Sequence, residues 1–251
     1  VNILQAGDEI VAAAGLYGGT VELFDDLEGL GITTRYVLDN EPSDYEALIN
    51  DKTKLIFAET IGNPKLDVTD IEAVAKLAHS HNIPLIIDNT VATPYLVRPI
   101  GLGADIVVNS SSKYMNGHSN SISGILTWSG KFAWDYERYP GLKPYRKFGA
   151  MSYIVKLRNG LFRSTGGCLS PQNAFYNTLG LETLGIRMER ECGNALELAV
   201  FLRDEMKLEV NYPGLPDSKY HEVAGRLLEH GYGAIITVRA GSKEKAFKII
   251  N

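Results

Sequence analysis

The sequence predicts an α/β protein whose larger part is a mainly parallel β-sheet with helices on both faces, followed by a smaller C-terminal α/β domain. In the first half of the chain, short apolar runs of strand length alternate with amphipathic helical patterns, which is typical of parallel sheets. A sustained 3.6-residue periodicity follows from Pro171, and a separate apolar run lies beyond it at 234–240. We therefore expect a large domain over residues 1–185 and a partial small domain over residues 186–251.

The predicted elements follow one another in regular order. Runs rich in Val and Ile predict strands, and apolar residues spaced three or four apart between them predict helices. Gly31 closes the first helix, and the third begins near Thr69, whose hydroxyl suits an N-cap. Strands are expected at 9–15, 33–39, 54–60, 83–90 and 104–112, and helices at 20–31, 44–50 and 68–82.

The pattern breaks between Lys131 and Ser164. Aromatic, basic and proline residues are mixed there without a clear period, so we expect a long irregular excursion, and such loops in compact domains are usually functional. The chain begins at Val1 instead of a methionine and stops inside an amphipathic helical pattern at 242–251. We therefore expect the sequence to be a piece of a longer protein, truncated at both ends.

The composition excludes several classes of protein. The net charge is −5 and 22% of the residues are charged, so no basic surface is expected for nucleic acid or an anionic membrane. No apolar run reaches the roughly 20 residues that span a bilayer, and no signal-peptide pattern opens the chain. Cys168 and Cys192 fit no metal-binding spacing and are expected to be reduced thiols of a cytoplasmic protein.

Polar residues follow three of the predicted strands. Glu59 and Asn63 follow the third, Asp88 ends the fourth, and three serines with Lys113 follow the fifth. Ligands of open parallel sheets bind beyond the carboxyl ends of the strands, so these side chains are expected to meet in one pocket. Each residue alone also has an ordinary explanation, since Asp88 could cap a helix and Lys113 could be a solvated surface lysine.

Together these residues suit pyridoxal 5′-phosphate (PLP). A lysine amine such as that of Lys113 can form a Schiff base with the cofactor, and neighbouring serine hydroxyls can bind its phosphate. A buried carboxylate such as that of Asp88 can keep the pyridine nitrogen protonated, so that the ring draws electrons from the substrate. The separation of Asp88 and Lys113 leaves room for one connection and one strand, which would place both at neighbouring strand ends.

Four motifs carry a resemblance to a known family. In order along the chain they read GLYGGT at 15–20, ETIGNP at 59–64, IDNTVATP at 87–94 and SSSKYMNGHSN at 110–120. In this order and spacing they resemble the Cys/Met-metabolism family of fold-type-I PLP-dependent transferases. The resemblance extends over essentially the whole chain.

The resemblance implies a part for each motif in holding PLP. Lys113 is implied as the Schiff-base lysine, Asp88 as the partner of the pyridine nitrogen and Tyr17 as the ring stacked on the cofactor, and these three are the expected catalytic residues. Stacking on a pyridinium would give an aromatic side chain both dispersion and a cation–π attraction. The residues implied to bind PLP are Lys113, Asp88, Tyr17, Asn63 (near the phenolic oxygen), Ser110 and Ser112 (at the phosphate).

Within the family, the long segment after the lysine resembles the O-acetylhomoserine sulfhydrylase branch. The expected reaction is a γ-replacement in methionine biosynthesis, which converts O-acetyl-L-homoserine and sulfide (or a thiol) to homocysteine and acetate. A cystathionine γ-synthase, or a methionine or cystathionine γ-lyase, is the alternative within the family. A non-catalytic α/β module that only holds an anion such as phosphate is a more distant alternative.

The expected pocket is incomplete within this sequence. The resemblance implies phosphate-binding amides before Val1 and a carboxylate-binding arginine beyond Asn251. No arginine of the four motifs neutralises the phosphate, so a cation must come from elsewhere. We therefore expect a homo-oligomer, a dimer of dimers, whose only other partners are an amino-acid substrate and sulfide or a thiol, with no nucleic acid and no membrane.

Overall fold

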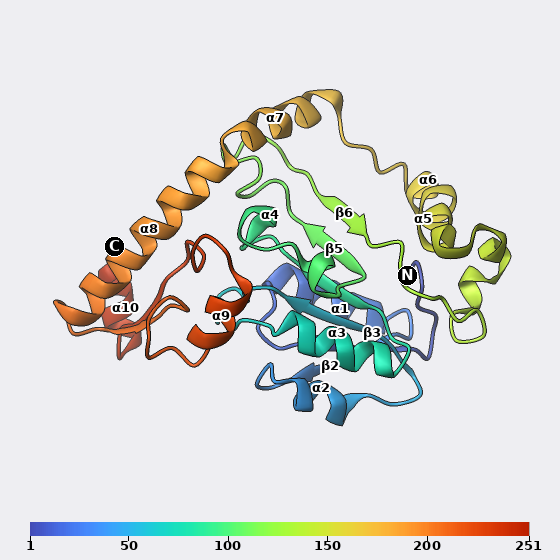
Figure 1. Cartoon of the computed structure of the whole chain (residues 1–251), viewed down its shortest axis with the longest axis horizontal. Coiled ribbons are helices and arrows are strands. Elements are labelled where there is room, and N and C mark those ends of the chain that lie inside the picture. Colours follow the sequence, from blue (N-terminus) through green and yellow to red (C-terminus); the bar gives the residue numbers. More distant parts are fainter. Residues whose placement is uncertain (251) are drawn as a thin grey trace.

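The computed structural model describes residues 1–250 and confirms a mainly parallel sheet with helices around it (Figure 1). Its six strands lie in the order β2-β1-β3-β4-β5-β6, and all neighbours are parallel except β5 and β6. The strands are β1 (Glu9–Ala13), β2 (Thr33–Val37), β3 (Thr53–Glu59), β4 (Leu85–Asp88), β5 (Ile106–Asn109) and β6 (Ile125–Trp128). The helices between them are α1 (Gly18–Glu28), α2 (Pro42–Leu48), α3 (Ile71–Ser80) and α4 (Thr93–Leu96).

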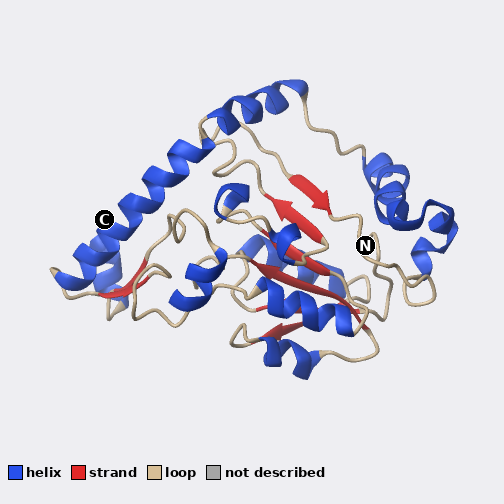
Figure 2. Cartoon of the chain, in the orientation of Figure 1, coloured by secondary structure: helices blue, strands red, loops and turns tan. Residues whose placement is uncertain are grey.

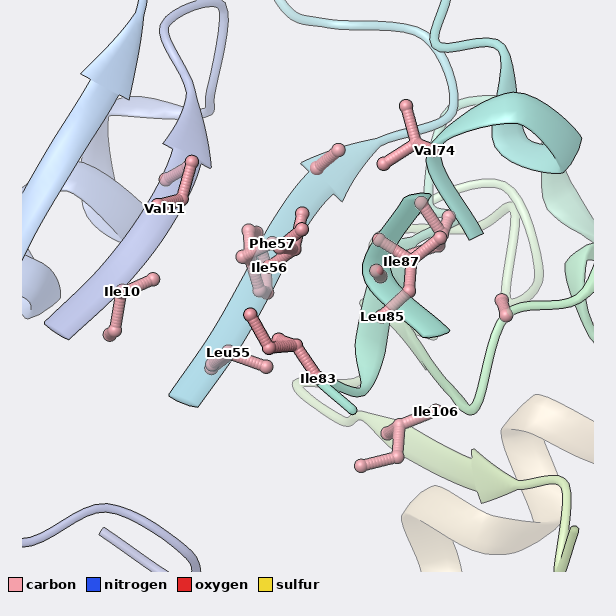
Figure 3. Close-up of a cluster of buried hydrophobic side chains, with 14 of the residues drawn as sticks. Ile10, Val11, Leu55, Ile56, Phe57, Val74, Ile83, Leu85, Ile87 and Ile106 are labelled. Atoms are coloured by element: carbon pink, nitrogen blue, oxygen red, sulfur yellow. The ribbon is translucent and has the colours of Figure 1, made fainter. Parts of the chain in front are cut away.

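The central strands are mostly apolar because the sheet buries them on both faces. All five residues of β1 and six of the seven residues of β3 are buried. Figure 3 shows Ile10 and Val11 of β1, Leu55 and Ile56 of β3 and Ile87 of β4 within this core. The outer strands β2 and β6 are more exposed, as edge strands are.

The strand register brings the predicted polar residues to one edge of the sheet. Glu59 pairs with Asp88 between β3 and β4, and Asp88 pairs with Val108 between β4 and β5. Because these strands run parallel, the residues that follow them emerge side by side. The segment that carries Lys113 begins one residue after β5 ends at Asn109.

Several predicted elements need correction. Helix α2 begins at Pro42 and not at Asp44. The N-cap of α3 is Asp70, whose side chain accepts a hydrogen bond from the Ala73 amide at 3.2 Å, while the Thr69 hydroxyl donates to the Glu59 carbonyl at 2.7 Å. Strand β6 was not expected, because its short and exposed run gives no core pattern.

The expectation of an irregular excursion from Lys131 to Ser164 is wrong for most of that segment. It contains 3-10 turns over η2 (Pro140–Met151), then α5 (Ser152–Leu157), η3 (Arg158–Phe162) and α6 (Arg163–Thr165). Trp134 stacks on Tyr153 with ring centroids 5.6 Å apart, and the rings of Phe132 and Tyr139 also adjoin Trp134. All of these rings belong to the main core or pack against it. Burial of these aromatic side chains gives the segment its order.

The C-terminal part is built around one long helical rod, which Figure 2 shows as two nearly continuous helices. Helix α7 (Pro171–Glu182) is followed directly by α8 (Leu184–Asp204), with Thr183 between them. Beyond α8 lie β7 (Glu209–Asn211), α9 (His221–Leu227), β8 (Thr237–Arg239) and α10 (Lys243–Ile250), and β7 pairs with β8 in a separate two-stranded sheet. Among the helices of residues 1–250, none combines the length and apolar character that crossing a membrane requires.

Candidate active site

A cavity of about 1040 Å³ opens at the carboxyl ends of β3, β4 and β5. The structure brings together around it every residue that the sequence predicted for the site. These residues are Tyr17, Asn63, Asp88, Ser110, Ser112 and Lys113. They come from four separate segments, so their meeting depends on the order of the strands.

Asp88 is held in place by one neighbour and keeps one oxygen free. The Thr90 amide donates to Asp88 Oδ1 at 2.9 Å, and the Thr90 hydroxyl donates to the same oxygen at 2.5 Å. The Ser110 amide in turn donates to that hydroxyl at 2.7 Å, which ties β4 to the segment after β5. Within residues 1–250 no donor reaches Asp88 Oδ2. Burial raises the pKa of Asp88, so a cationic N–H group in the cavity would be a favourable partner for this carboxylate.

Glu59 is a part of the site to which the sequence assigned no role. Its Oε1 accepts a hydrogen bond from the Tyr17 amide at 2.7 Å, and its Oε2 accepts one from the Asn63 amide at 3.3 Å. The side chain is buried and lines the cavity. Burial, opposed by these hydrogen bonds and supported by the charge of Asp88, raises the pKa of Glu59 to about 8. Glu59 therefore sets the positions of both Tyr17 and Asn63.

Tyr17 presents its ring to the cavity from the start of α1. It is the N-cap residue of that helix, and 55% of its surface is exposed. A Cβ atom on Gly19 would lie 2.8 Å from the Tyr17 ring, so glycine at that position leaves the ring its room. An exposed aromatic face at the mouth of a cavity can stack on a flat ligand.

The segment around Lys113 is a compact turn held by main-chain bonds. The Lys113 amide donates to the Ser110 carbonyl at 3.2 Å, and the Gly117 amide donates to the Lys113 carbonyl at 2.8 Å. Within residues 1–250 the Lys113 amine has neither a hydrogen-bond partner nor an ion pair. It is therefore available to a ligand in the cavity.

The two predicted phosphate ligands differ in their hydrogen bonding. The Ser112 hydroxyl donates to the Ser123 carbonyl at 3.1 Å and accepts from the Ser123 amide at 2.7 Å. The Ser110 hydroxyl bonds to no group among the described residues, so it can donate to an anion as it stands. Ser111, which was not predicted to bind the cofactor, faces away into a buried network with Ser123 and Asn177.

Two residues of α8 complete the wall of the cavity and were missed by sequence reasoning. Arg187 and Glu191 lie one helical turn apart and both line the cavity. Their positions depend on how α8 packs over the Lys113 turn, and no local motif around them signals that packing. A charged pair at helical spacing is ordinarily a solvated face.

The chemical groups that line the cavity are of the kinds that bind PLP. They offer an amine for its aldehyde at Lys113, a carboxylate for its ring nitrogen at Asp88, an aromatic face at Tyr17 and a free hydroxyl at Ser110. Across residues 1–250 no group of three or more His, Cys, Asp or Glu side chains is arranged to hold a metal ion.

Comparison with known proteins gives a consistent picture. The model of the family described as Cys/Met metabolism PLP-dependent enzyme matches residues 1–251. An O-acetyl-L-homoserine sulfhydrylase from Leptospira meyeri is 43% identical over 100% of this chain, and the chain spans 62% of that relative.

Two solved structures are also similar. An O-acetylhomoserine sulfhydrylase from Wolinella succinogenes superposes with a TM-score of 0.87 at 39% sequence identity. The match covers 98% of this chain and 71% of the chain of that enzyme. A Campylobacter jejuni protein described as an O-acetylhomoserine (thiol)-lyase superposes with a TM-score of 0.90 at 31% identity, covering 99% of this chain and 65% of its own. That second structure contains a pyridoxyl-lysine monophosphate.

Proposed function

The chain belongs to the Cys/Met metabolism PLP-dependent enzymes, and we propose that it carries the active site of an O-acetylhomoserine sulfhydrylase. The reaction joins sulfide, or a thiol, to Cγ of O-acetyl-L-homoserine and releases acetate, so that sulfide yields homocysteine. The observation that carries the proposal is the meeting of Lys113, Asp88 and Tyr17 at one cavity from three separate segments. Relatives named as sulfhydrylases support this reaction over the γ-lyases and over a non-catalytic anion-binding module.

The residues of the cavity would divide the binding of PLP among them. Lys113 would hold the aldehyde carbon, Asp88 the ring nitrogen through Oδ2, Asn63 the side of the phenolic oxygen and Tyr17 one face of the ring. When bound, PLP withdraws electrons from Cα of the substrate and so makes the neighbouring C–H groups acidic.

Lys113 has the central part in moving protons. With the substrate in the cavity, the Lys113 amine would be placed to accept the proton of Cα. A second proton must leave Cβ before acetate departs from Cγ. Sulfide then adds at Cγ, and protons return to Cβ and Cα to give homocysteine. The turn around Lys113 keeps its amine in the cavity throughout this sequence.

Asp88 would hold positive charge at the ring nitrogen of PLP. Thr90 fixes its Oδ1 through two hydrogen bonds, so its Oδ2 has a set direction before the cofactor binds. A carboxylate that is oriented in advance stabilises the charge without reorganising during the reaction.

Ser110 is the stronger of the two serine candidates for the phosphate. Its hydroxyl is free to donate, whereas the proton of the Ser112 hydroxyl is directed at the Ser123 carbonyl. Ser112 would have to give up this bond, or would act through the Ser123 segment that it holds. The phosphate also requires positive charge, which we propose comes from a second subunit.

We propose that the full protein is a homo-oligomer with shared active sites, most simply a dimer of dimers. The support is that Arg187, which lines the cavity, already directs its guanidinium to Thr183, Tyr114 and Gly180, in a chain that spans 62% of its relatives. Sedimentation equilibrium of the full-length protein with PLP is expected to give a homotetramer, or at least a dimer. A fully active monomer would contradict the shared site.

We also propose a two-domain division and a cytoplasmic location. Residues 1–185 would form the PLP-binding large domain, and 186–251 part of a smaller one, which the separate β7–β8 sheet supports. Cys168 and Cys192 are free thiols 24 positions apart in sequence, one exposed and one buried, as in a reducing compartment.

A substrate panel tests the proposed function. The purified full-length protein is incubated with PLP and O-acetyl-L-homoserine, with sulfide, cysteine or no sulfur donor, and separately with methionine and cystathionine. We expect homocysteine and acetate in equal amounts with sulfide, and little product from methionine or cystathionine. A protein that develops no visible absorption with PLP, and loses none on borohydride treatment, would instead support a non-catalytic module.

A further inference from the structure

Arg187 joins helix α8 to the turn that carries Lys113. Its Nη1 donates to the Tyr114 carbonyl at 2.7 Å, directly after Lys113 in the chain. Its Nη2 donates to the Gly180 carbonyl at 2.8 Å, and its Nε donates to the Thr183 hydroxyl at 3.0 Å. One guanidinium group therefore holds three acceptors, one on the turn and two at the junction of α7 and α8.

Two glycines make this close packing possible. A Cβ atom on Gly117, which has a φ of 74°, would lie 2.5 Å from Arg187 Cζ. A Cβ atom on Gly180 would lie 2.2 Å from the Asn116 carbonyl oxygen. The turn thus packs directly on the Arg187 guanidinium at Gly117 and on the backbone of α7 at Gly180.

The turn needs a support of this kind because its outer end is exposed and the Lys113 amine has no partner of its own in residues 1–250. Residues 117–120 are all exposed. Toward the sheet the turn is held by bonds among 110–117, such as that of the Asn116 amide to the Ser111 carbonyl at 3.0 Å. From the helical rod, Asn177 of α7 bonds to Asn116 and Ser111, and Arg187 adds a bond to the carbonyl that directly follows Lys113.

We propose that Arg187 is a positioning residue, which fixes the turn through the Tyr114 carbonyl so that the Lys113 amine meets PLP and substrate in the right place. This inference rests on the proposed function, because it concerns the same lysine. Arginine suits the task because its planar guanidinium can reach three acceptors in fixed directions, which the single ammonium of lysine cannot do. Displacement of a reacting group by about 1 Å can cost on the order of a hundredfold in rate.

The test compares Arg187→Ala, Arg187→Lys and Thr183→Val with Arg190→Ala as the matched control. Arg190 lies on the same helix, is exposed, and forms no hydrogen bond or ion pair within residues 1–250. For each purified full-length variant, PLP is added to the apo form and three quantities are measured. They are the total PLP bound, the rate at which PLP becomes reducible onto Lys113 by borohydride, and the kcat and KM for O-acetyl-L-homoserine with sulfide.

We expect Arg187→Ala to bind total PLP within about threefold of the control but to attach it to Lys113 at least about tenfold more slowly. We expect kcat to fall by roughly tenfold to a hundredfold while KM changes much less, since the substrate contacts are kept. Arg187→Lys should recover less than half of the lost attachment rate. Full recovery with lysine would overturn the inference, because it would show that charge alone is required.

Attachment at the control rate in Arg187→Ala would also overturn the inference. If that variant fails to fold, as judged by its thermal transition, Thr183→Val decides, because it keeps Arg187 and removes the acceptor of Nε together with the bond of the Thr183 hydroxyl to the Gly180 carbonyl. Slower attachment in Thr183→Val than in Arg190→Ala supports the positioning role, and equal attachment contradicts it. If wild-type protein attaches no PLP to Lys113 at all, the proposed function itself fails, which is a distinct result from an unaffected Arg187 variant.

Discussion

Glu59 and Asp88 lie directly opposite each other at the ends of the parallel strands β3 and β4. Burial is the largest reason why the pKa of each carboxyl lies above its ordinary value, and the charge of Asp88 raises the pKa of Glu59 further, to about 8. Near neutral pH a pKa of about 8 keeps Glu59 mainly protonated. Neutral Glu59 still bonds to the amides of Tyr17 and Asn63.

Replacing Lys113 should separate PLP binding from catalysis. In Lys113→Ala we expect kcat for γ-replacement to fall by at least roughly a thousandfold, because the same amine holds PLP and moves the Cα proton. PLP should still bind noncovalently through Asp88, Tyr17 and Ser110, which dialysis and absorbance would measure. Lys113→Arg should be equally inactive, since its guanidinium does not give up a proton near neutral pH. Lys131→Ala serves as the control, and turnover near wild type in Lys113→Ala would refute the assignment.

Replacing Asp88 should affect both the rate and the affinity for PLP. Asp88→Asn keeps the shape of the side chain and removes the charge that would hold the ring nitrogen protonated. We expect kcat to fall on the order of a hundredfold or more, with weaker PLP binding, measured by steady-state kinetics and by titration of the apo protein. A variant within a factor of two of wild type would show that Asp88 does not face the pyridine nitrogen.

Glu59 should make the stability of the apo protein depend on pH. Its folded pKa of about 8 lies above its ordinary value of 4.5, so between these pH values the folded state binds a proton that the unfolded state has lost. The contribution of Glu59 to stability is therefore fully present below pH 4.5 and falls as pH rises toward 8, by up to about 1 kcal/mol per pH unit. When urea unfolding is measured from pH 5 to pH 9, the free energy of unfolding should fall less steeply with pH in Glu59→Gln than in wild type. Identical slopes for the two proteins would contradict the raised pKa.

Ser110 and Ser112 should differ when each is replaced by alanine. Ser110→Ala should weaken PLP binding by roughly tenfold with little change in thermal stability, because its hydroxyl bonds to nothing else among the described residues. Ser112→Ala should lower the free energy of unfolding of the apo protein by about 1 kcal/mol, because Ser123 loses two hydrogen bonds. Calorimetry and PLP titration of both apo variants check this prediction. Equal changes in PLP affinity and in stability for the two variants would show that the roles of Ser110 and Ser112 do not differ.

The sequence sufficed for the parts of the site that follow strands. Asp88 and Lys113 were predictable because polar residues directly after apolar runs must emerge at the carboxyl edge of a parallel sheet. Glu59 was visible in the same way, but its bond to the Tyr17 amide joins residues 42 positions apart and depends on β3 lying beside β1. Arg187 was not predictable, because only the packing of α8 over the Lys113 turn brings it to the cavity.

The error over residues 131–164 has a different origin. Prolines such as Pro140 and Pro144 indicate loops in a sequence, yet here they lie within η2, whose 3-10 turns do not follow a 3.6-residue period. The order of that segment comes from rings packed on the core, such as Trp134 against Tyr139 at 5.2 Å. Contacts of this kind leave no periodic pattern.

The reversed direction of β6 affects the order in which the protein folds. Asn109 pairs with Ile125, so the connection that carries Lys113 joins two adjacent antiparallel strands whose paired residues lie 125 − 109 = 16 positions apart. The bond of Arg187 to Tyr114 joins residues 73 positions apart, and contacts nearer in sequence cost less entropy to close and form faster. The loop around Lys113 is therefore expected to close before α8 docks on it, and Arg187 would secure a turn that already exists. In pulse-labelled hydrogen exchange during refolding, the amides of β5 and β6 should gain protection earlier than those of α8, and the reverse order would refute this sequence of events.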